Sequence, residues 1–156
     1  MVKCIKHSIL GDMAKTEIIT QNSEETERAG EILAAEILRG EIVAPLVIGL
    51  MGDLGSGKTT FARGFAKGLG VKDKITSPTF VIFKKYLFSA GNLYHVDCYR
   101  IKDAKDLAEL DFSETLKLKE NVILIEWAEK IKNILPKDTI WMNFKYLDEN
   151  KRKITA

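Results

Sequence analysis

Two short, almost uninterrupted apolar runs stand out along the chain. Leu46–Met51 has the sequence LVIGLM between a proline and a glycine, and Val122–Ile125 has the sequence VILI immediately before Glu126. Short runs without alternation are typical of strands that are buried on both faces of a sheet. The pattern therefore predicts central strands covered by helices on both sides.

The two longest helical patterns flank the first of these runs. The segment from Ser23 to Gly40 opens with Glu24 and Glu25, which suit the positive end of a helix dipole, and its glycine is a suitable stop. The expected buried stripe of this helix contains Ala29, Ile32, Leu33, Glu36 and Ile37. A second helix is predicted from about Lys58 to Gly68, with a buried side marked by Phe61, Phe65 and Leu69.

Segments rich in β-branched and aromatic residues predict hairpins around this core. Phe80–Phe88 and Asn92–Tyr99 are separated by a turn so short that they must pair antiparallel. A closing hairpin is predicted from Thr139–Tyr146 and Arg152–Thr155, and a further strand from Thr16–Thr20. Together these elements indicate a three-layer α/β fold with a mixed, mainly parallel central sheet and added hairpins. Shorter helices are predicted at 102–110, 112–118 and 128–134.

Length and charge limit the possible organisation. The 156 residues suit a single domain, which we expect to span 16–156, while residues 1–15 show no clear period and are interpreted as an N-terminal arm without an assigned role. The 24 basic and 22 acidic residues give a net charge of +2, which is too even to indicate nucleic-acid binding by charge alone.

The remaining composition predicts a cytoplasmic protein. Cys4 and Cys98 form neither a metal-spaced pair nor a disulfide framework, so we interpret them as free thiols in a reducing compartment. No apolar run approaches the roughly 18 residues that a membrane span needs, and the first residues lack the apolar core of a signal peptide. We therefore expect no membrane contact.

The clearest chemical motif lies between the first apolar run and the second helix. Gly52–Thr59 (GDLGSGKT) matches the phosphate-binding pattern G-x-x-x-x-G-K-[ST] at every fixed position. The glycines let backbone amides converge on phosphate oxygens, and the helix start adds its dipole. Lys58 supplies a charge to the β and γ phosphates, and the Thr59 hydroxyl is a hard ligand for Mg²⁺. The expected nucleotide contacts from this segment are Asp53, Leu54, Gly55, Ser56, Gly57, Lys58, Thr59 and Thr60.

A phosphate-binding loop of this type also needs a carboxylate on a neighbouring strand. Asp97 and Glu126 both follow predicted strands, and Glu126 is the better match because four aliphatic residues lead directly into it. Each carboxylate alone is equally compatible with an ordinary solvated strand end. The sequence requires at least one of them in the site and leaves open which lies closer to the metal.

Several other residues have two interpretations. His95 can lie near the site or be an ordinary core or surface histidine, and Arg100 can contact phosphate or solvent. Trp127 can pack in the core or at the rim of the cleft. The basic run Lys151–Lys153 is most simply interpreted as solvated charge.

Taken together, the motifs resemble the TsaE family, also called YjeE, over most of the chain. The resemblance rests on Ser23–Thr26 (SEET), Gly52–Thr60 (GDLGSGKTT), Ser77–Phe80 (SPTF), Tyr94–Arg100 (YHVDCYR) and Leu124–Trp127 (LIEW). The chain departs from the family pattern at Cys98, where a leucine is usual, and in the first fifteen residues, which have no assigned counterpart. Neither departure touches an expected phosphate or metal ligand.

The resemblance implies a role in tRNA modification. Members of this family are ATPases that work with the proteins TsaB and TsaD, and TsaD transfers a threonylcarbamoyl group to adenosine 37 of tRNA. By this analogy ATP and Mg²⁺ are the cofactors, with Thr59 and Glu126 binding the metal and Asp97 positioning or activating water. Ser77 and Thr79 resemble a switch segment, and the helix start at Ser23 and Thr26 is placed near the base. Lys58, Asp97 and Glu126 are then the expected catalytic residues, and contact with tRNA is indirect, through the complex.

Two rival functions remain from the sequence. One is a P-loop kinase of a small metabolite, although no obvious lid or arginine-rich insertion is present to close over a second substrate. The other is a nucleotide-dependent binding module without useful hydrolysis. The sequence contains no motif that selects ATP over GTP.

Overall fold

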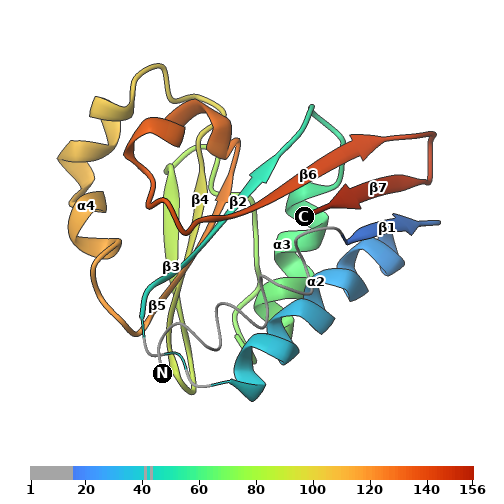
Figure 1. The fold of residues 1–156 in the computed structure, drawn as a ribbon, viewed down its shortest axis with the longest axis horizontal. Coiled ribbons are helices and arrows are strands. Elements are labelled where there is room, and N and C mark those ends of the chain that lie inside the picture. The colour runs from blue at the N-terminus through green and yellow to red at the C-terminus, as the bar shows by residue number, and fades with distance from the viewer. Residues whose placement is uncertain (1–15, 41, 43) are drawn as a thin grey trace.

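The two apolar runs form neighbouring parallel strands at the centre of a seven-stranded sheet (Figure 1). The computed structural model describes residues 16–40, 42 and 44–156, so the predicted arm, residues 1–15, lies outside the described residues. Strand β2 (Leu46–Met51) pairs with β5 (Asn121–Glu126), all six residues of which are buried. This burial confirms the interpretation of the runs as strands covered on both faces.

The strand order is β1-β7-β6-β2-β5-β4-β3. The four central strands run parallel, whereas β1 with β7, β6 with β7 and β3 with β4 are antiparallel. The mixed sheet with added hairpins is thus confirmed. The remaining strands are β1 (Glu17–Thr20), β3 (Phe83–Phe88), β4 (Gly91–Asp97), β6 (Ile140–Tyr146) and β7 (Arg152–Thr155).

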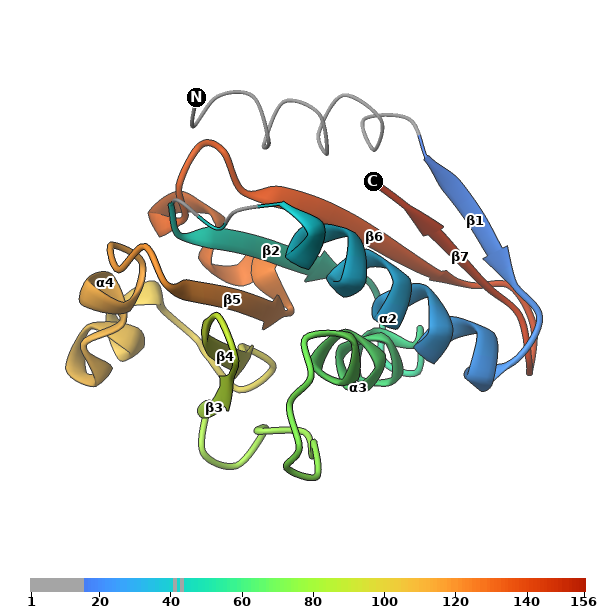
Figure 2. The ribbon, with the colours of Figure 1, turned by 90° about the horizontal axis from the view of Figure 1, so that it is seen from below.

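Helices cover both faces of the sheet, as Figures 1 and 2 show. Helices α2 (Ser23–Arg39) and α3 (Lys58–Gly68) lie side by side on one face. The other face carries the short helix α4 (Phe112–Thr115) and two 3₁₀ helices, η1 (Ala104–Leu110) and η2 (Ala128–Ile134). Successive residues of β2 and β5 alternate between these two layers.

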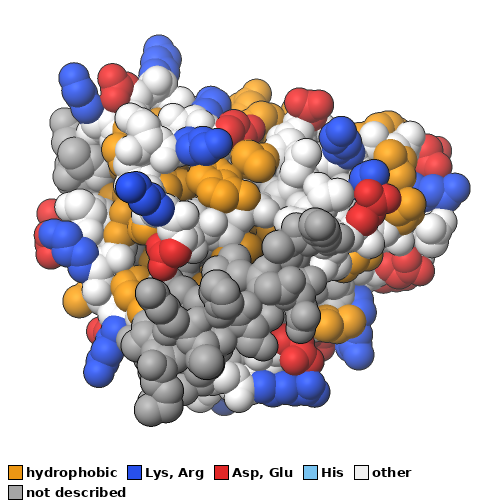
Figure 3. Space-filling view, viewed as in Figure 1, with side chains coloured by type: hydrophobic (Ala, Val, Ile, Leu, Met, Phe, Trp, Pro, Cys, Tyr) orange, Lys and Arg blue, Asp and Glu red, His pale blue; other side chains and the backbone are white. Residues whose placement is uncertain are grey.

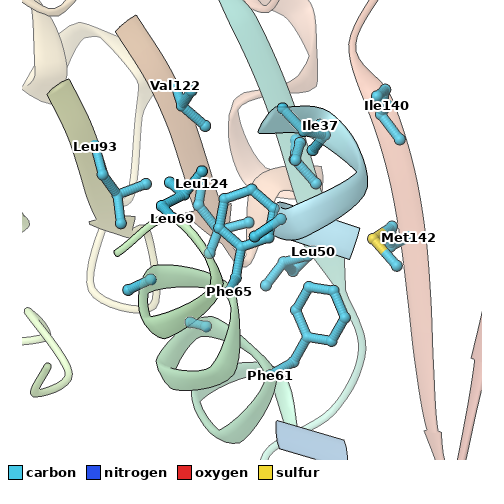
Figure 4. Packing of buried hydrophobic residues seen from close by; sticks show 14 of the residues in the cluster. Ile37, Leu50, Phe61, Phe65, Leu69, Leu93, Val122, Leu124, Ile140 and Met142 are labelled. Carbon is cyan, nitrogen blue, oxygen red and sulfur yellow. The ribbon is translucent and has the colours of Figure 1, made fainter. Parts of the chain in front are cut away.

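The larger core lies between the sheet and the helix pair (Figure 4). Phe61 and Phe65 of α3, and Leu69 just after its end, project toward Leu50 and Leu124 of the central strands, as the helical spacing predicts. On the opposite face, Val47, Ile123 and Ile125 pack against η1, α4 and η2. Fixing both faces of the central strands holds their carboxyl ends at a defined edge.

The predicted apolar stripe of α2 is wrong in part. Ile32 is 52% exposed and Glu36 is also exposed, whereas the buried face consists of Thr26, Gly30, Ala34 and Ile37. Small residues are buried because the α2 and α3 backbones nearly touch: a Cβ added at Gly30 would lie 2.2 Å from the carbonyl oxygen of Phe61. The helix starts as expected, with the side chain of Asn22 accepting a hydrogen bond from the Glu25 amide at 2.8 Å.

Some predicted boundaries are also wrong. The strand expected at 80–88 begins only at Phe83, because Ile82 has a φ of 68° and Phe80 lies 84% exposed in the preceding turn. The strand expected at 92–99 ends at Asp97, whose carboxylate accepts the Tyr99 amide and turns the chain. The helix expected at 112–118 is one turn ending at Thr115.

Lysine and arginine side chains are interspersed with acidic side chains over the face seen in Figure 3. This mixture agrees with the nearly even charge balance of the sequence. In the part of the chain that the structure describes, no helix combines the length and apolar character that crossing a membrane requires.

Candidate nucleotide-binding site

The carboxyl ends of the parallel strands bring the predicted chemistry to one edge of the sheet. In the strand register Glu126 lies beside Leu50 on one side and beside Asp97 on the other, and the Gly52–Thr59 loop leaves β2 at the same edge. Ligand sites of parallel α/β sheets lie at this edge. A cleft of about 590 Å³ opens here, within the range of small-molecule sites.

Every predicted site residue except Asp53 lines this cleft. The predicted residues present are Thr26, Leu54, Gly55, Ser56, Gly57, Lys58, Thr59, Thr60, Ser77, Thr79, Asp97 and Glu126. Asp53 is exposed, and its backbone carbonyl serves the loop by accepting hydrogen bonds from Lys58 and the Ser56 amide. Ser23, which the resemblance places near the base with Thr26, and Trp127, which the sequence left open, also line the cleft. The cleft further includes residues that the sequence did not assign to it, namely Asn22, Tyr99, Glu149, Asn150 and Arg152.

The loop has a backbone that only glycine adopts easily. Gly52, Gly55 and Gly57 have φ values of 135°, 76° and 100°, in the region that L side chains rarely adopt. At Gly52 an added Cβ would also lie 2.2 Å from the carbonyl oxygen of Phe144 on β6. The turn therefore requires glycine at these positions, and at Gly52 the close contact with β6 requires it as well.

Lys58 is folded back into its own loop. Its ammonium donates to the carbonyl oxygens of Gly52 and Asp53, the latter at 2.9 Å, and lies 4.0 Å from the centre of the Trp127 ring. The side chain is buried, and this burial lowers the pKa of Lys58, opposed mainly by the charge of Glu126. The tryptophan left open by the sequence therefore forms a wall of the site beside the lysine.

A buried hydrogen-bonded chain links three elements. The Thr59 hydroxyl, in the first turn of α3, donates to Oε2 of Glu126 at 2.7 Å. The other carboxylate oxygen, Oε1, lies 2.7 Å from Nε2 of His95 on β4. Glu126 is 2% exposed and His95 1% exposed, so the histidine that the sequence left open contacts a predicted metal ligand.

Asp97 is held by the predicted switch segment. Its Oδ2 atom accepts hydrogen bonds from Ser77 at 3.1 Å and from Thr79 at 2.7 Å, and its Oδ1 atom accepts the Tyr99 amide at 2.9 Å. The two hydroxyls also contact each other. The segment at 77–79 therefore lies directly against the carboxylate that the resemblance associates with water.

The donor set suits Mg²⁺ bound together with a triphosphate. The oxygens of Thr59 and Glu126 are hard ligands lying side by side at the loop end of α3. Among the described residues no group of three or more His, Cys, Asp or Glu residues is arranged to hold a metal ion by itself. Mg²⁺ commonly uses one or two protein oxygens and takes the rest from phosphates and water, so these residues fit that ion.

Residues from near both ends of the described chain, Thr26 and Arg152, lie against the glycine-rich loop. Thr26 is buried and its hydroxyl contacts that of Thr20 at 2.7 Å. Arg152, at the start of β7, donates from Nε to the carbonyl oxygen of Gly55 at 3.0 Å and lies 4.7 Å from the Tyr146 ring. The interpretation of Arg152 as merely solvated charge is wrong, because strand pairing brings it against the phosphate loop.

The other residues left open lie away from the cleft. The guanidinium of Arg100 lies 4.6 Å from the Phe80 ring and does not line the cleft. Lys151 and Lys153 form surface ion pairs with Asp148 and Glu17. Cys98 is a free, fully buried thiol, and burial raises its pKa to about 12, whereas Cys4 lies outside the described residues.

Comparison with known proteins gives a consistent result. A family model described as threonylcarbamoyl adenosine biosynthesis protein TsaE matches residues 20–154. The tRNA threonylcarbamoyladenosine biosynthesis protein TsaE of Rickettsia felis is 42% identical over 136 residues, covering 86% of this chain and 75% of the relative. The Bacillus subtilis protein of the same name is 38% identical, covering 87% and 81%. The crystal structure of Bacillus subtilis YdiB superposes on this chain with a TM-score of 0.72 and is 33% identical to it. The superposition covers 90% of this chain and 83% of YdiB.

Proposed function

The chain belongs to the TsaE family, and we propose that it binds and hydrolyses Mg²⁺-ATP as a component of tRNA threonylcarbamoyladenosine biosynthesis. The observation that carries the proposal is the meeting of three groups in one cleft. These are the glycine-rich loop with Lys58, the Thr59–Glu126 pair, and Asp97 with the hydroxyls of Ser77 and Thr79.

The loop and Lys58 account for phosphate binding. The loop amides and the start of α3 form a cradle for anionic oxygens, and Lys58 is already dehydrated and held at its centre. On binding, its ammonium would exchange the carbonyls of Gly52 and Asp53 for the β and γ phosphates. A buried ammonium group that already faces the phosphates needs little rearrangement during the reaction. It can therefore stabilise the negative charge that develops on the phosphate oxygens in the transition state.

Thr59 and Glu126 would hold Mg²⁺, which when bound neutralises charge on the phosphate oxygens. Asp97 would orient the attacking water and take its proton, because it is the other carboxylate at the phosphate end of the cleft. Ser77 and Thr79 presently occupy Oδ2 of Asp97. A response of these hydroxyls to the γ phosphate would free that oxygen for water, which makes the segment a switch.

We place this activity in the cytoplasm, beside partners of the TsaB and TsaD families, with tRNA reached only through that complex. The names of the related proteins support the pathway. Exposed loop residues such as Leu54 and Glu149 form part of the cleft wall, which supports an active site that needs a partner for full turnover.

ATP hydrolysis measured on the chain alone, and then with purified TsaB and TsaD proteins, tests the proposal. We expect slow release of free phosphate alone and a clear increase with the partners. Asp97→Ala should remove the increase while retaining ADP binding. No stimulation by the partners, or transfer of phosphate to a small acceptor without them, would count against the proposed function.

A further inference from the structure

His95 has no role in the function described so far, although it contacts Glu126, which is assigned to Mg²⁺. His95 lies on β4 opposite Leu124 of β5, one pleat away from the last residue of that strand, Glu126. Both side chains are almost completely buried. Burying two such polar groups costs free energy unless their hydrogen bonds are made, so their arrangement is informative.

The contacts define which nitrogen of His95 carries the proton. An ionised carboxylate offers only acceptors, so Nε2, at 2.7 Å from Oε1 of Glu126, must donate to it. The other ring nitrogen, Nδ1, is buried and has no hydrogen-bond partner among the described residues. A proton there would be a buried donor without an acceptor, which is unfavourable. The geometry therefore selects the tautomer with hydrogen on Nε2.

We propose that His95 is a positioning residue for Glu126. Its Nε2–H fixes Oε1, which leaves Oε2 turned toward Thr59, where the two oxygens form the pair assigned to Mg²⁺. The inference rests on that proposed metal role. Donors that orient a ligating carboxylate typically change metal affinity by about 10- to 100-fold when they are lost.

The tautomer of His95 can be determined by NMR spectroscopy of the full-length protein. In ¹⁵N-labelled wild-type protein, long-range ¹H–¹⁵N correlation should show the Nε2 atom of His95 protonated and the Nδ1 atom unprotonated. The assignment is checked by loss of the signals in a His95→Gln variant. A signal pattern with the proton on Nδ1 would overturn the proposal, because Nε2 could then not donate to Glu126.

The effect of His95 on Mg²⁺ binding is measured by calorimetry of ADP binding with and without Mg²⁺. The quantity compared between variants is the increase in ADP affinity that Mg²⁺ causes. His95→Gln places an amide donor near the position of Nε2, whereas His95→Met has a similar length and no donor. His95→Asn is the polar control, since its amide lies near the position of the unpartnered Nδ1. We expect Gln to keep the gain and Met and Asn to reduce it by about 10-fold or more, with ADP affinity in EDTA unchanged.

Reference variants separate this inference from the proposed function. If Thr59→Ala and Glu126→Gln leave the Mg²⁺-dependent gain intact, the metal site itself is wrong. If they abolish it while His95→Met behaves as wild type, only the positioning role is wrong. Should the Met variant fail to fold, a loss of the gain in His95→Gln, or the opposite tautomer in the wild-type spectrum, still overturns the proposal.

Discussion

Gly64→Ala tests the close contact of the two helices that carry the cleft. A Cβ at this position would lie 1.7 Å from the carbonyl oxygen of Glu27 on α2 and 2.6 Å from its carbonyl carbon. Moving the oxygen contact from 1.7 Å to the 3.0 Å limit of real Cβ contacts requires a shift of 1.3 Å. The obstructing atoms are backbone, so no side-chain rotation relieves the clash.

The expected magnitude follows from two opposing terms. Overpacking of a close-packed interface costs about 1–3 kcal/mol and occasionally more, whereas alanine is favoured over glycine within a helix by about 1 kcal/mol. Because a shift of this size also disturbs the rest of the contact between α2 and α3, we expect the clash to exceed the gain. The free energy of unfolding should fall by about 2 kcal/mol.

Urea unfolding followed by far-UV circular dichroism measures this change. Gly68→Ala is the graded control, since its Cβ would lie 2.4 Å from the carbonyl oxygen of Glu31 and requires a smaller shift. Ala35→Gly, at an exposed position of α2, measures only the difference in helix propensity between alanine and glycine, without any clash. The reasoning is refuted if Gly64→Ala is as stable as the wild type, or if Gly68→Ala is the more damaging of the two glycine substitutions.

Three further predictions concern the site and its surroundings. Lys58→Ala should weaken ATP binding or turnover by about 100-fold or more, because the phosphates lose a buried counterion; wild-type turnover in this variant would contradict the phosphate-loop assignment. Arg152→Ala should weaken ADP binding about fivefold in calorimetry, about 1 kcal/mol, because the support of the Gly55 carbonyl is lost, and an equal effect of the surface control Lys151→Ala would refute this. Since the pKa of Cys98 is raised from 9.0 to about 12, the stability that its neutral form contributes is complete below about pH 9 and is lost as pH rises toward 12. Unfolding free energies should therefore fall more steeply above pH 9 in the wild type than in Cys98→Ala, by up to about 1.4 kcal/mol per pH unit, and parallel curves would refute the predicted link.

The central strands and the glycine-rich turn between β2 and α3 were predictable because their signals are local. The run Leu46–Met51 is apolar at nearly every position, and the loop after it has a fixed spacing of glycine, lysine and threonine. The position of Glu126 and Asp97 at one edge then follows from parallel pairing. For each strand and for the loop, residues within a few positions of one another contain the necessary information.

The buried face of α2 depended on the neighbouring helix and could not be predicted in this way. Apolar periodicity predicted that Ile32 is buried. The contact with α3 instead buries small residues such as Gly30, because the two helix backbones lie so close together. Arg152 was missed, and the role of His95 was left open, for a related reason. Each acquires its role from a partner far away in sequence, Glu126 in one case and Gly55 in the other. Only the tertiary pairing reveals these contacts.

The pairing of β1 with β7 has a consequence for the growing chain. Thr20 lies opposite Arg152 in this pairing, and 132 positions of sequence separate the two residues. A ribosome therefore produces the phosphate loop and its lysine long before it produces the arginine against which the loop rests. Support of the Gly55 carbonyl by this arginine is therefore absent until the chain extends beyond residue 152, so shorter nascent chains are expected to bind nucleotide at least about fivefold more weakly.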